Sequence, residues 1–177
     1  MILYRHADPR FPFLQETANQ PAARWHAAGE GPVQYLADTP DGAWAEFLRH
    51  EEITLEEELR NVRRALWVIQ VPDSIRPAEL QIKPKIATGG LETYLACQAE
   101  ARRLRSEGAK ELRAPSAALL QGGAGGWMVK EGLKPGPSRN GFVFALFGPR
   151  PDLVGWAATV AGRPSRDLLK WVRYFGS

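Results

Sequence analysis

Residues 32–50 have the sequence PVQYLADTPDGAWAEFLRH, which predicts a strand followed directly by a helix. Val33, Tyr35 and Ala37 alternate with their neighbours, the period-two pattern of a strand, so Tyr35 shares a face with Val33. Thr39 and Pro40 then supply an N-cap residue and a proline at the first helical position. We therefore expect a strand over the first six residues of this stretch and a helix from there to about His50.

The segments on either side of this unit predict further strands and helices. Strands are expected at residues 2–5, 66–71, 142–147 and 154–160. Residues 54–57 have the spacing of a capping box and open a short acidic helix, and a longer helix is expected at 91–105. In the longer helix Leu91, Leu95 and Leu104 are expected inside, with Gly108 ending it, while residues 165–175 fit either helix or strand. This order does not fit regular βαβ winding and predicts one mixed α/β domain over residues 1–177.

Composition sets limits on the class of protein. The chain has 177 residues, of which 44% are apolar and 24% charged, as in a compact domain. Its one cysteine, Cys97, has no internal partner for a disulfide, which favours a buried thiol in a reducing compartment and a cytoplasmic location. We expect neither a signal peptide nor a membrane association, because no apolar run has the required length.

Charge is unevenly distributed along the chain. The net charge is +3, but residues 130–177 carry 8 basic and 3 acidic residues, against 15 and 17 in the remainder. This basic end could face a nucleotide, an acidic protein or nucleic acid about equally well, and a solvated surface without a ligand is the more frequent explanation of such a bias.

Several standard catalytic motifs are absent from the sequence. Glycines at 122, 123, 125 and 126 form a loop without the lysine of a phosphate-binding loop, so a flexible turn is the simpler interpretation. The three histidines are isolated from one another and sit near no paired cysteines or carboxylates at ligand spacing, and we therefore expect no metal site. Ser116 lacks the glycine elbow of a hydrolase nucleophile.

One ordered set of residues is more informative. Residues 23–26 (ARWH), Gly29, the stretch 33–40 (VQYLADTP) and the stretch 43–47 (AWAEF) occur in that order, and 112–117 (LRAPSA) follows later. This series resembles the RES domain family, in which an Arg-Trp pair, a glycine turn, a Tyr-Leu-Ala strand, a Thr-Pro helix start, an Ala-x-x-Glu helix and a Pro-Ser-Ala segment follow one another. The three residues that name the family would be Arg24, Glu46 and Ser116.

The resemblance implies a fold, an activity and partners. The fold would be similar to that of ADP-ribosyltransferases, with mostly antiparallel split sheets and flanking helices. The activity would be cleavage of NAD at the nicotinamide–ribose bond, by a toxin of a toxin–antitoxin pair with NAD as substrate and no metal. ADP-ribose transfer to a protein is the close alternative, an antitoxin is the implied protein partner, and a homodimer stays open.

The residue types agree with this chemistry. Arg24 is a permanent cation that can grip a diphosphate, and Tyr35, with Trp25 beside Arg24, offers an aromatic surface for the nicotinamide ring. Glu46 can stabilise the oxocarbenium that forms as the glycosidic bond opens. Ser116 can support Glu46 or bind the nicotinamide amide.

Each of these residues also has a purely structural interpretation. Arg24 could pack on Trp25 at the surface, Tyr35 could be core, and Ser116 could begin a turn. Glu46 precedes Arg49 and His50 by three and four residues, the spacing of an exposed helical ion pair.

The sequence departs from the family pattern at two places. His26 stands where relatives commonly have asparagine, and Gln121 with the glycine loop replaces an asparagine-rich segment, so that Gln121, Asn140 or neither could take over its contacts. A different class of function, a non-catalytic module that binds nucleic acid or protein through the basic C-terminal third, ranks below the enzyme because no nucleic-acid-binding motif is present.

Overall fold

The computed structural model describes residues 1–72 and 76–176. Its main feature is a six-stranded sheet in the order β4-β7-β2-β1-β3-β8, in which all the paired strands run antiparallel. The strands are β1 (Ile2–Ala7), β2 (Val33–Ala37), β3 (Arg64–Gln70), β4 (Glu111–Pro115), β7 (Phe142–Phe147) and β8 (Val154–Gly162). The four strands predicted outside the central unit, and the strand within it, are confirmed.

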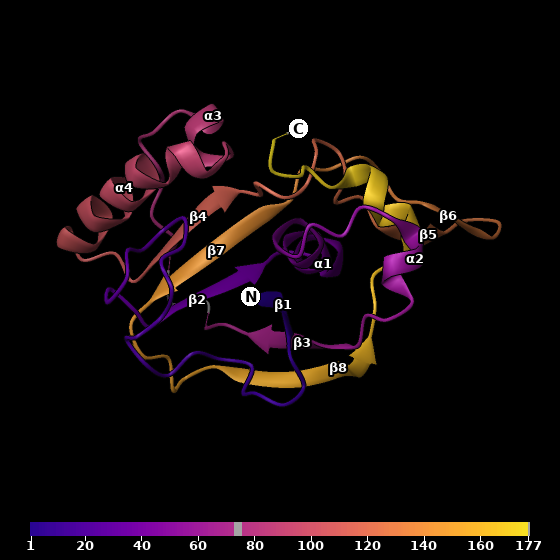
Figure 1. Ribbon diagram of the computed structural model, residues 1–177, viewed down its shortest axis with the longest axis horizontal. Helices are drawn as coiled ribbons and strands as arrows, with labels where there is room; N and C mark the ends of the chain where they lie inside the picture. Colours follow the sequence, from indigo (N-terminus) through magenta and orange to yellow (C-terminus); the bar gives the residue numbers. More distant parts are fainter. Residues whose placement is uncertain (73–75, 177) are drawn as a thin grey trace.

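This sheet is almost divided into two halves. β2 pairs with β7 over five residues, and β1 pairs with β3 over six, but β1 and β2 are joined by the single pair Tyr4–Ala37. The strands of the two halves run in clearly different directions in Figure 1. The predicted mostly antiparallel, split arrangement is therefore confirmed, and regular βαβ winding is excluded for the paired strands.

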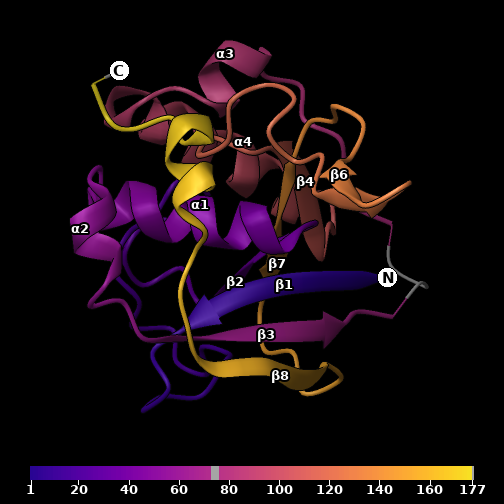
Figure 2. The same ribbon diagram turned by 90° about the vertical axis from the view of Figure 1, so that its right-hand side faces the viewer.

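Helix α1 (Pro40–His50) forms where the sequence predicts it. Thr39 is the N-cap, and its hydroxyl oxygen accepts a hydrogen bond of 3.0 Å from the Gly42 amide. A Cβ atom at Gly42 would lie 3.0 Å from the Cβ of Ala37, so glycine lets the first turn of α1 pack tightly on β2. The helix crosses the sheet beside β1 and β2, as Figure 2 shows.

Helix α4 (Tyr94–Ser106) covers a different part of the sheet. It follows α3 (Pro84–Ala87) and the 3-10 turn η1 (Leu91–Thr93), and Gly108 ends the segment with a φ of +88°. The predicted inner face was partly wrong: Leu104 is buried, but Leu91 and Leu95 are 64% and 77% exposed. The buried face is formed by Cys97, Ala101 and Leu104, which pack in one cluster with Trp25. Leu95 is two and a half helical turns from Leu104 and therefore points the opposite way.

The remaining elements frame one side of the molecule. They are α2 (Glu56–Leu59), the hairpin β5 (Trp127–Val129) and β6 (Leu133–Pro135), and the 3-10 helix η2 (Arg166–Trp171). The predicted capping box was one residue off, because the carboxylate of Glu58, rather than Glu57, accepts the amides of Thr54 and Leu55 at 3.0 Å. Within the described ranges, none of the helices has the length and apolar character of a membrane span.

The core explains where a site can form. Val33, Tyr35 and Ala37 lie on one face of β2 because side chains alternate along a strand. Ala37 packs in the cluster of α1, whereas Val33 packs in the cluster of α4. Tyr35 therefore lies between the two helices, on a stretch of sheet that neither helix covers fully.

Candidate active site

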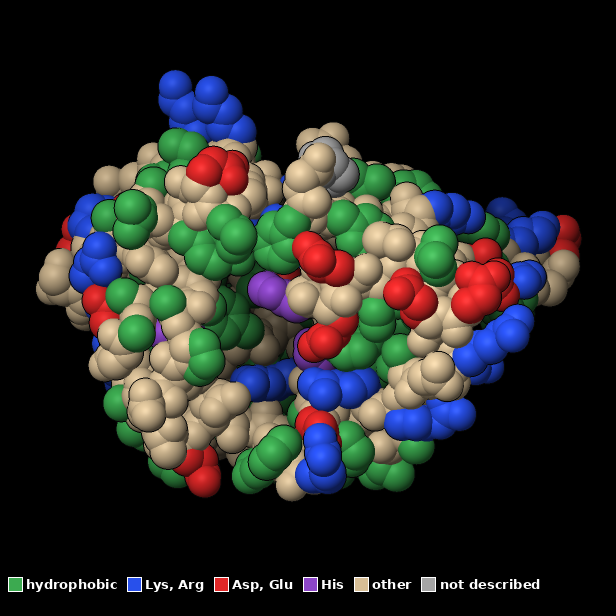
Figure 3. All heavy atoms as spheres, in the orientation of Figure 1, with side chains coloured by type: hydrophobic (Ala, Val, Ile, Leu, Met, Phe, Trp, Pro, Cys, Tyr) green, Lys and Arg blue, Asp and Glu red, His purple; other side chains and the backbone are tan. Residues whose placement is uncertain are grey.

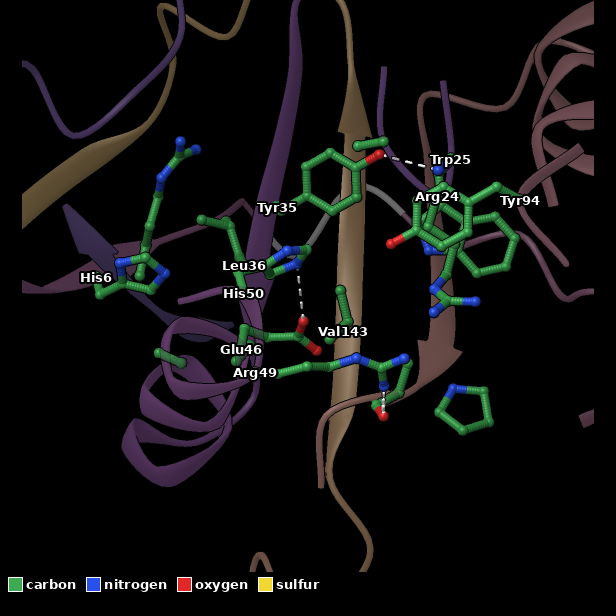
Figure 4. A pocket seen from close by; sticks show the side chains of 16 residues that line it. His6, Arg24, Trp25, Tyr35, Leu36, Glu46, Arg49, His50, Tyr94 and Val143 are labelled. Atoms are coloured by element: carbon green, nitrogen blue, oxygen red, sulfur yellow. Dashed lines mark hydrogen bonds and ion pairs between the residues drawn. The ribbon is translucent and has the colours of Figure 1, made fainter. Parts of the chain in front are cut away.

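A cavity of about 240 Å³ opens between α1 and α4. Its lining comes from four strands of the sheet (β1, β2, β4 and β7), from both helices, from residues 23–25 and from the turn after β4. The lining residues are Arg5, His6, Ala23, Arg24, Trp25, Tyr35, Leu36, Ala37, Ala43, Glu46, Arg49, His50, Tyr94, Pro115, Ala117 and Val143. Figure 4 shows the labelled side chains converging on it. The structure thus brings together four of the five predicted site residues, and the fifth, Ser116, lies between two lining residues.

Glu46 lies on α1 with its carboxylate facing the cavity (Figure 4), and its side chain is 25% exposed. One carboxylate oxygen, Oε2, is 3.8 Å from Nε2 of His50, and the other, Oε1, accepts a 3.4 Å hydrogen bond from the Ser116 hydroxyl. The carboxylate is therefore held from two sides while remaining accessible from the cavity.

Ser116 is buried directly after β4. Its Oγ accepts hydrogen bonds from the amides of Ala118 and Leu119 at 3.2 and 3.1 Å, which leaves its single hydrogen for Glu46. Ser116 therefore has both the structural contacts of a residue that begins a turn and a hydrogen bond to the carboxylate of Glu46.

Tyr35 is fixed by its hydroxyl group. The hydroxyl oxygen accepts a 3.0 Å hydrogen bond from the Trp25 amide and lies 2.9 Å from Nδ1 of the buried His26. Burial raises the pKa of Tyr35 and lowers the pKa of His26, which favours a neutral phenol beside a neutral imidazole. The ring of Tyr35 stays on the cavity wall, whereas the side chain of Trp25 is only 1% exposed.

Arg24 is not the surface residue that its alternative interpretation required, since it is 9% exposed. Its guanidinium donates to the Gly89 carbonyl at 2.7 Å and to Oγ1 of Thr93 at 3.2 Å, and it lies 4.8 Å from the centre of the Tyr94 ring. These contacts tie the strand side of the cavity to the start of α4.

The sequence did not identify five polar or aromatic lining residues: Arg5, His6, Arg49, His50 and Tyr94. The helical ion pair predicted for Glu46 is confirmed with the exposed His50, at 3.8 Å, but is wrong for Arg49, which is 2% exposed and bonds to backbone carbonyls. Its spacing of three residues from Glu46 is a signal for a shared face, whereas Arg5 and His6 belong to no motif.

His6 gives the cavity an uncharged imidazole. Burial, followed by the nearby charge of Arg64, lowers its pKa to about 3. Among the side chains in residues 1–72 and 76–176, no group of three or more histidines, cysteines or acidic residues could hold a metal ion.

A second cavity, of about 320 Å³, lies between the glycine loop, the β5–β6 hairpin and η2. Its lining includes Asp41, Trp127, Asp167, Lys170 and Trp171. Gln121 and Asn140 line neither cavity, and Asn140 accepts a 3.0 Å hydrogen bond from the Gly122 amide, which holds the glycine loop.

Comparison with solved structures identifies the class of fold. The structure of the MbcT-MbcA toxin-antitoxin complex of M. tuberculosis contains a chain that matches 96% of this one with a TM-score of 0.61 and 16% identity, over 86% of that chain. The split antiparallel sheet and its flanking helices accordingly have the ADP-ribosyltransferase-like fold.

The family follows from the sequence comparison. The RES domain matches residues 2–129, which make up more than half of the chain, so this protein belongs to the RES domain family. A curated protein named Toxin Res, from Pseudomonas putida, is 42% identical over 59 residues. That alignment covers 33% of this chain and 39% of the Pseudomonas protein.

Proposed function

We propose that this protein cleaves NAD at the nicotinamide–ribose bond. The observation that carries the proposal is the convergence of Arg24, Tyr35 and Glu46 on one cavity between α1 and α4. The cavity is smaller than the roughly 300–1,000 Å³ usual for a drug-sized ligand, so it would enclose only part of a dinucleotide.

The residues divide the work of this reaction. The nicotinamide of NAD is a cationic leaving group, and its departure leaves positive charge on the ribose. Glu46 places a carboxylate beside that charge, and Ser116 holds the carboxylate in place. Tyr35 packs against the nicotinamide ring, and Arg24 binds the anionic part of the substrate. Water or phosphate then accepts the ADP-ribosyl group. Transfer of ADP-ribose to a protein would use the same residues with a different acceptor.

Incubation of the purified protein with NAD, with chromatographic detection of nicotinamide, tests this proposal. Glu46→Gln keeps the shape of the side chain but removes its charge, and we expect the rate to fall roughly 100-fold or more. Glu51→Gln is the matched control, because Glu51 follows the same helix but is exposed and outside the cavity. Equal rates for wild type and Glu46→Gln would contradict the proposal, and labelled NAD would separate hydrolysis from transfer to protein.

We further propose that the protein is the toxin of a toxin–antitoxin pair and acts in the cytoplasm. The Pseudomonas relative is named a toxin, and the solved neighbour is a toxin–antitoxin complex. Expression alone should arrest growth and deplete cellular NAD, whereas Glu46→Gln should do neither. Normal growth with undiminished NAD during wild-type expression would count against this role.

A further inference from the structure

Arg49 is a buried cation of the cavity to which the proposed reaction assigns no role. It follows Glu46 by three residues on α1, so the two side chains share a face of the helix. Figure 4 shows its guanidinium reaching past Glu46 toward the side of the cavity where Arg24 lies. A guanidinium that is 2% exposed must be compensated by partners or by a ligand.

The printed hydrogen-bond partners of Arg49 are neutral. Nη1 donates to the Ala117 carbonyl, and Nη2 donates to the Gly89 carbonyl at 3.3 Å. The ring of Phe175 lies 4.3 Å from its Cζ atom and closes the other side. Burial lowers the pKa of Arg49 and outweighs the opposing effect of Glu46, so its charge is only partly compensated.

Arg24 is likewise a buried arginine whose hydrogen-bond partners are neutral. It shares the Gly89 carbonyl with Arg49, and the two positive charges are near enough to oppose each other. Neither arginine forms an ion pair with a carboxylate in the described part of the chain. Arg5 adds a third guanidinium to the lining, whereas Glu46 is its one carboxylate. The cavity therefore has an excess of positive charge that suits a ligand with at least two negative charges.

We propose that Arg49 and Arg24 together bind the diphosphate of the dinucleotide substrate, with Phe175 as the residue that positions Arg49. This inference rests on the proposed function for the identity of the substrate. Each guanidinium has five N–H donors, so its backbone contacts leave donors for a phosphate oxygen. The shared Gly89 carbonyl fixes the two groups side by side, and Phe175 lies beyond the residues matched by the RES domain.

Binding measurements with three probes test the proposal by calorimetry: inorganic pyrophosphate, ADP-ribose and nicotinamide. For Arg49→Gln we expect the affinity for pyrophosphate and ADP-ribose to fall roughly ten- to hundredfold, since a charged hydrogen bond is lost. Nicotinamide carries no charge, so its affinity should stay unchanged, which a general loss of structure would not allow.

Arg105→Gln is the matched control. The Arg105 guanidinium also lies against an aromatic ring, 5.3 Å from the centre of Phe147, and donates to the Glu30 carbonyl at 3.2 Å, but it does not line the cavity. Its binding of all three probes should match that of the wild type. If Arg49→Gln does not fold, Arg49→Lys and Phe175→Leu replace it, and each should weaken pyrophosphate binding several-fold.

Unchanged pyrophosphate and ADP-ribose affinity in the folded Arg49 variants would overturn the proposal, as would a wild-type protein that binds neither anion. These outcomes are separable from the fate of the proposed reaction, because pyrophosphate binding requires no cleavage. Loss of pyrophosphate binding in Arg49→Gln without any NAD cleavage by the wild type would retain the anion site and reject the activity.

Discussion

The two cavities of this protein differ in chemistry more than in size. The larger one, beside the glycine loop, is lined by five glycines, by two exposed tryptophans and by polar or charged side chains that include Asp167 and Lys170; Trp127 is 59% exposed. The smaller one collects buried arginines, a supported carboxylate and a neutral imidazole. Buried charge is costly unless something compensates it, so the smaller cavity is the better candidate for a site. Figure 3 shows basic, acidic and histidine side chains around a hollow on one face of the molecule.

The largest expected contrast concerns a cation in each cavity. In Arg24→Gln, the KM for NAD should rise roughly ten- to hundredfold, because a charged hydrogen bond to the substrate is lost. Lys170→Gln removes a cation from the second cavity and should leave KM unchanged. Steady-state kinetics decide the comparison, and equal KM values for both variants would remove the distinction between the cavities.

An aromatic residue of each cavity gives a smaller contrast, in stability. Tyr35→Phe leaves the Trp25 amide and Nδ1 of His26 without their partner, so we expect the free energy of unfolding to fall by about 1–3 kcal/mol. Trp127→Phe changes an exposed ring and should alter this energy by less than about 0.5 kcal/mol. Urea denaturation measures both, and a neutral Tyr35→Phe would show that the hydroxyl network is dispensable.

The smallest contrast is in the pH dependence of stability. The pKa of His6 falls from 6.5 unfolded to about 3 folded, so the unfolded state binds the proton first and stability drops as pH decreases below about 6.5. Burial raises the pKa of Asp41, in the second cavity, so its contribution has the opposite sign and stability rises as that carboxylate is protonated.

Between pH 7 and 5 we expect His6 to account for roughly 1 kcal/mol of lost stability, given that it is only partly buried. His6→Asn should remove that loss, and His50→Asn, which changes an exposed histidine, should not. Parallel pH profiles for the wild type and His6→Asn would refute the assignment.

The sequence was sufficient for features fixed by local rules. Thr39-Pro40 set the start of α1, and alternation placed Tyr35 on the face of β2 between the helices. It failed where tertiary packing decides the outcome. Leu95 and Leu104 are nine residues apart, which is two and a half turns at 3.6 residues per turn, so they lie on opposite faces of α4. Leu104 faces inward with Cys97 and Ala101, and Leu95 therefore faces solvent.

The site residues also divide into those that local sequence predicts and those that only the tertiary structure brings in. The order of Arg24, Tyr35, Glu46 and Ser116 allowed the family pattern to be recognised, and all four meet at or beside one cavity. Arg5 and His6 could not be found in this way, because they enter the cavity only through the pairing of β1 with strands distant in sequence. The contact of Phe175 with Arg49 links the last residues of the chain to its first helix, a relation that no local pattern contains.

The single residue pair that joins the two halves of the sheet has a consequence for how this site can diversify. Backbone ladders do not fix the width of the gap between β1 and β2, so the packing of α1 across it must do so. Substitutions at the buried face of α1, such as Trp44 or Leu48, would then reshape the binding space without altering any reacting group. Substrate preference in this architecture can therefore change through buried residues of α1 that do not contact the substrate.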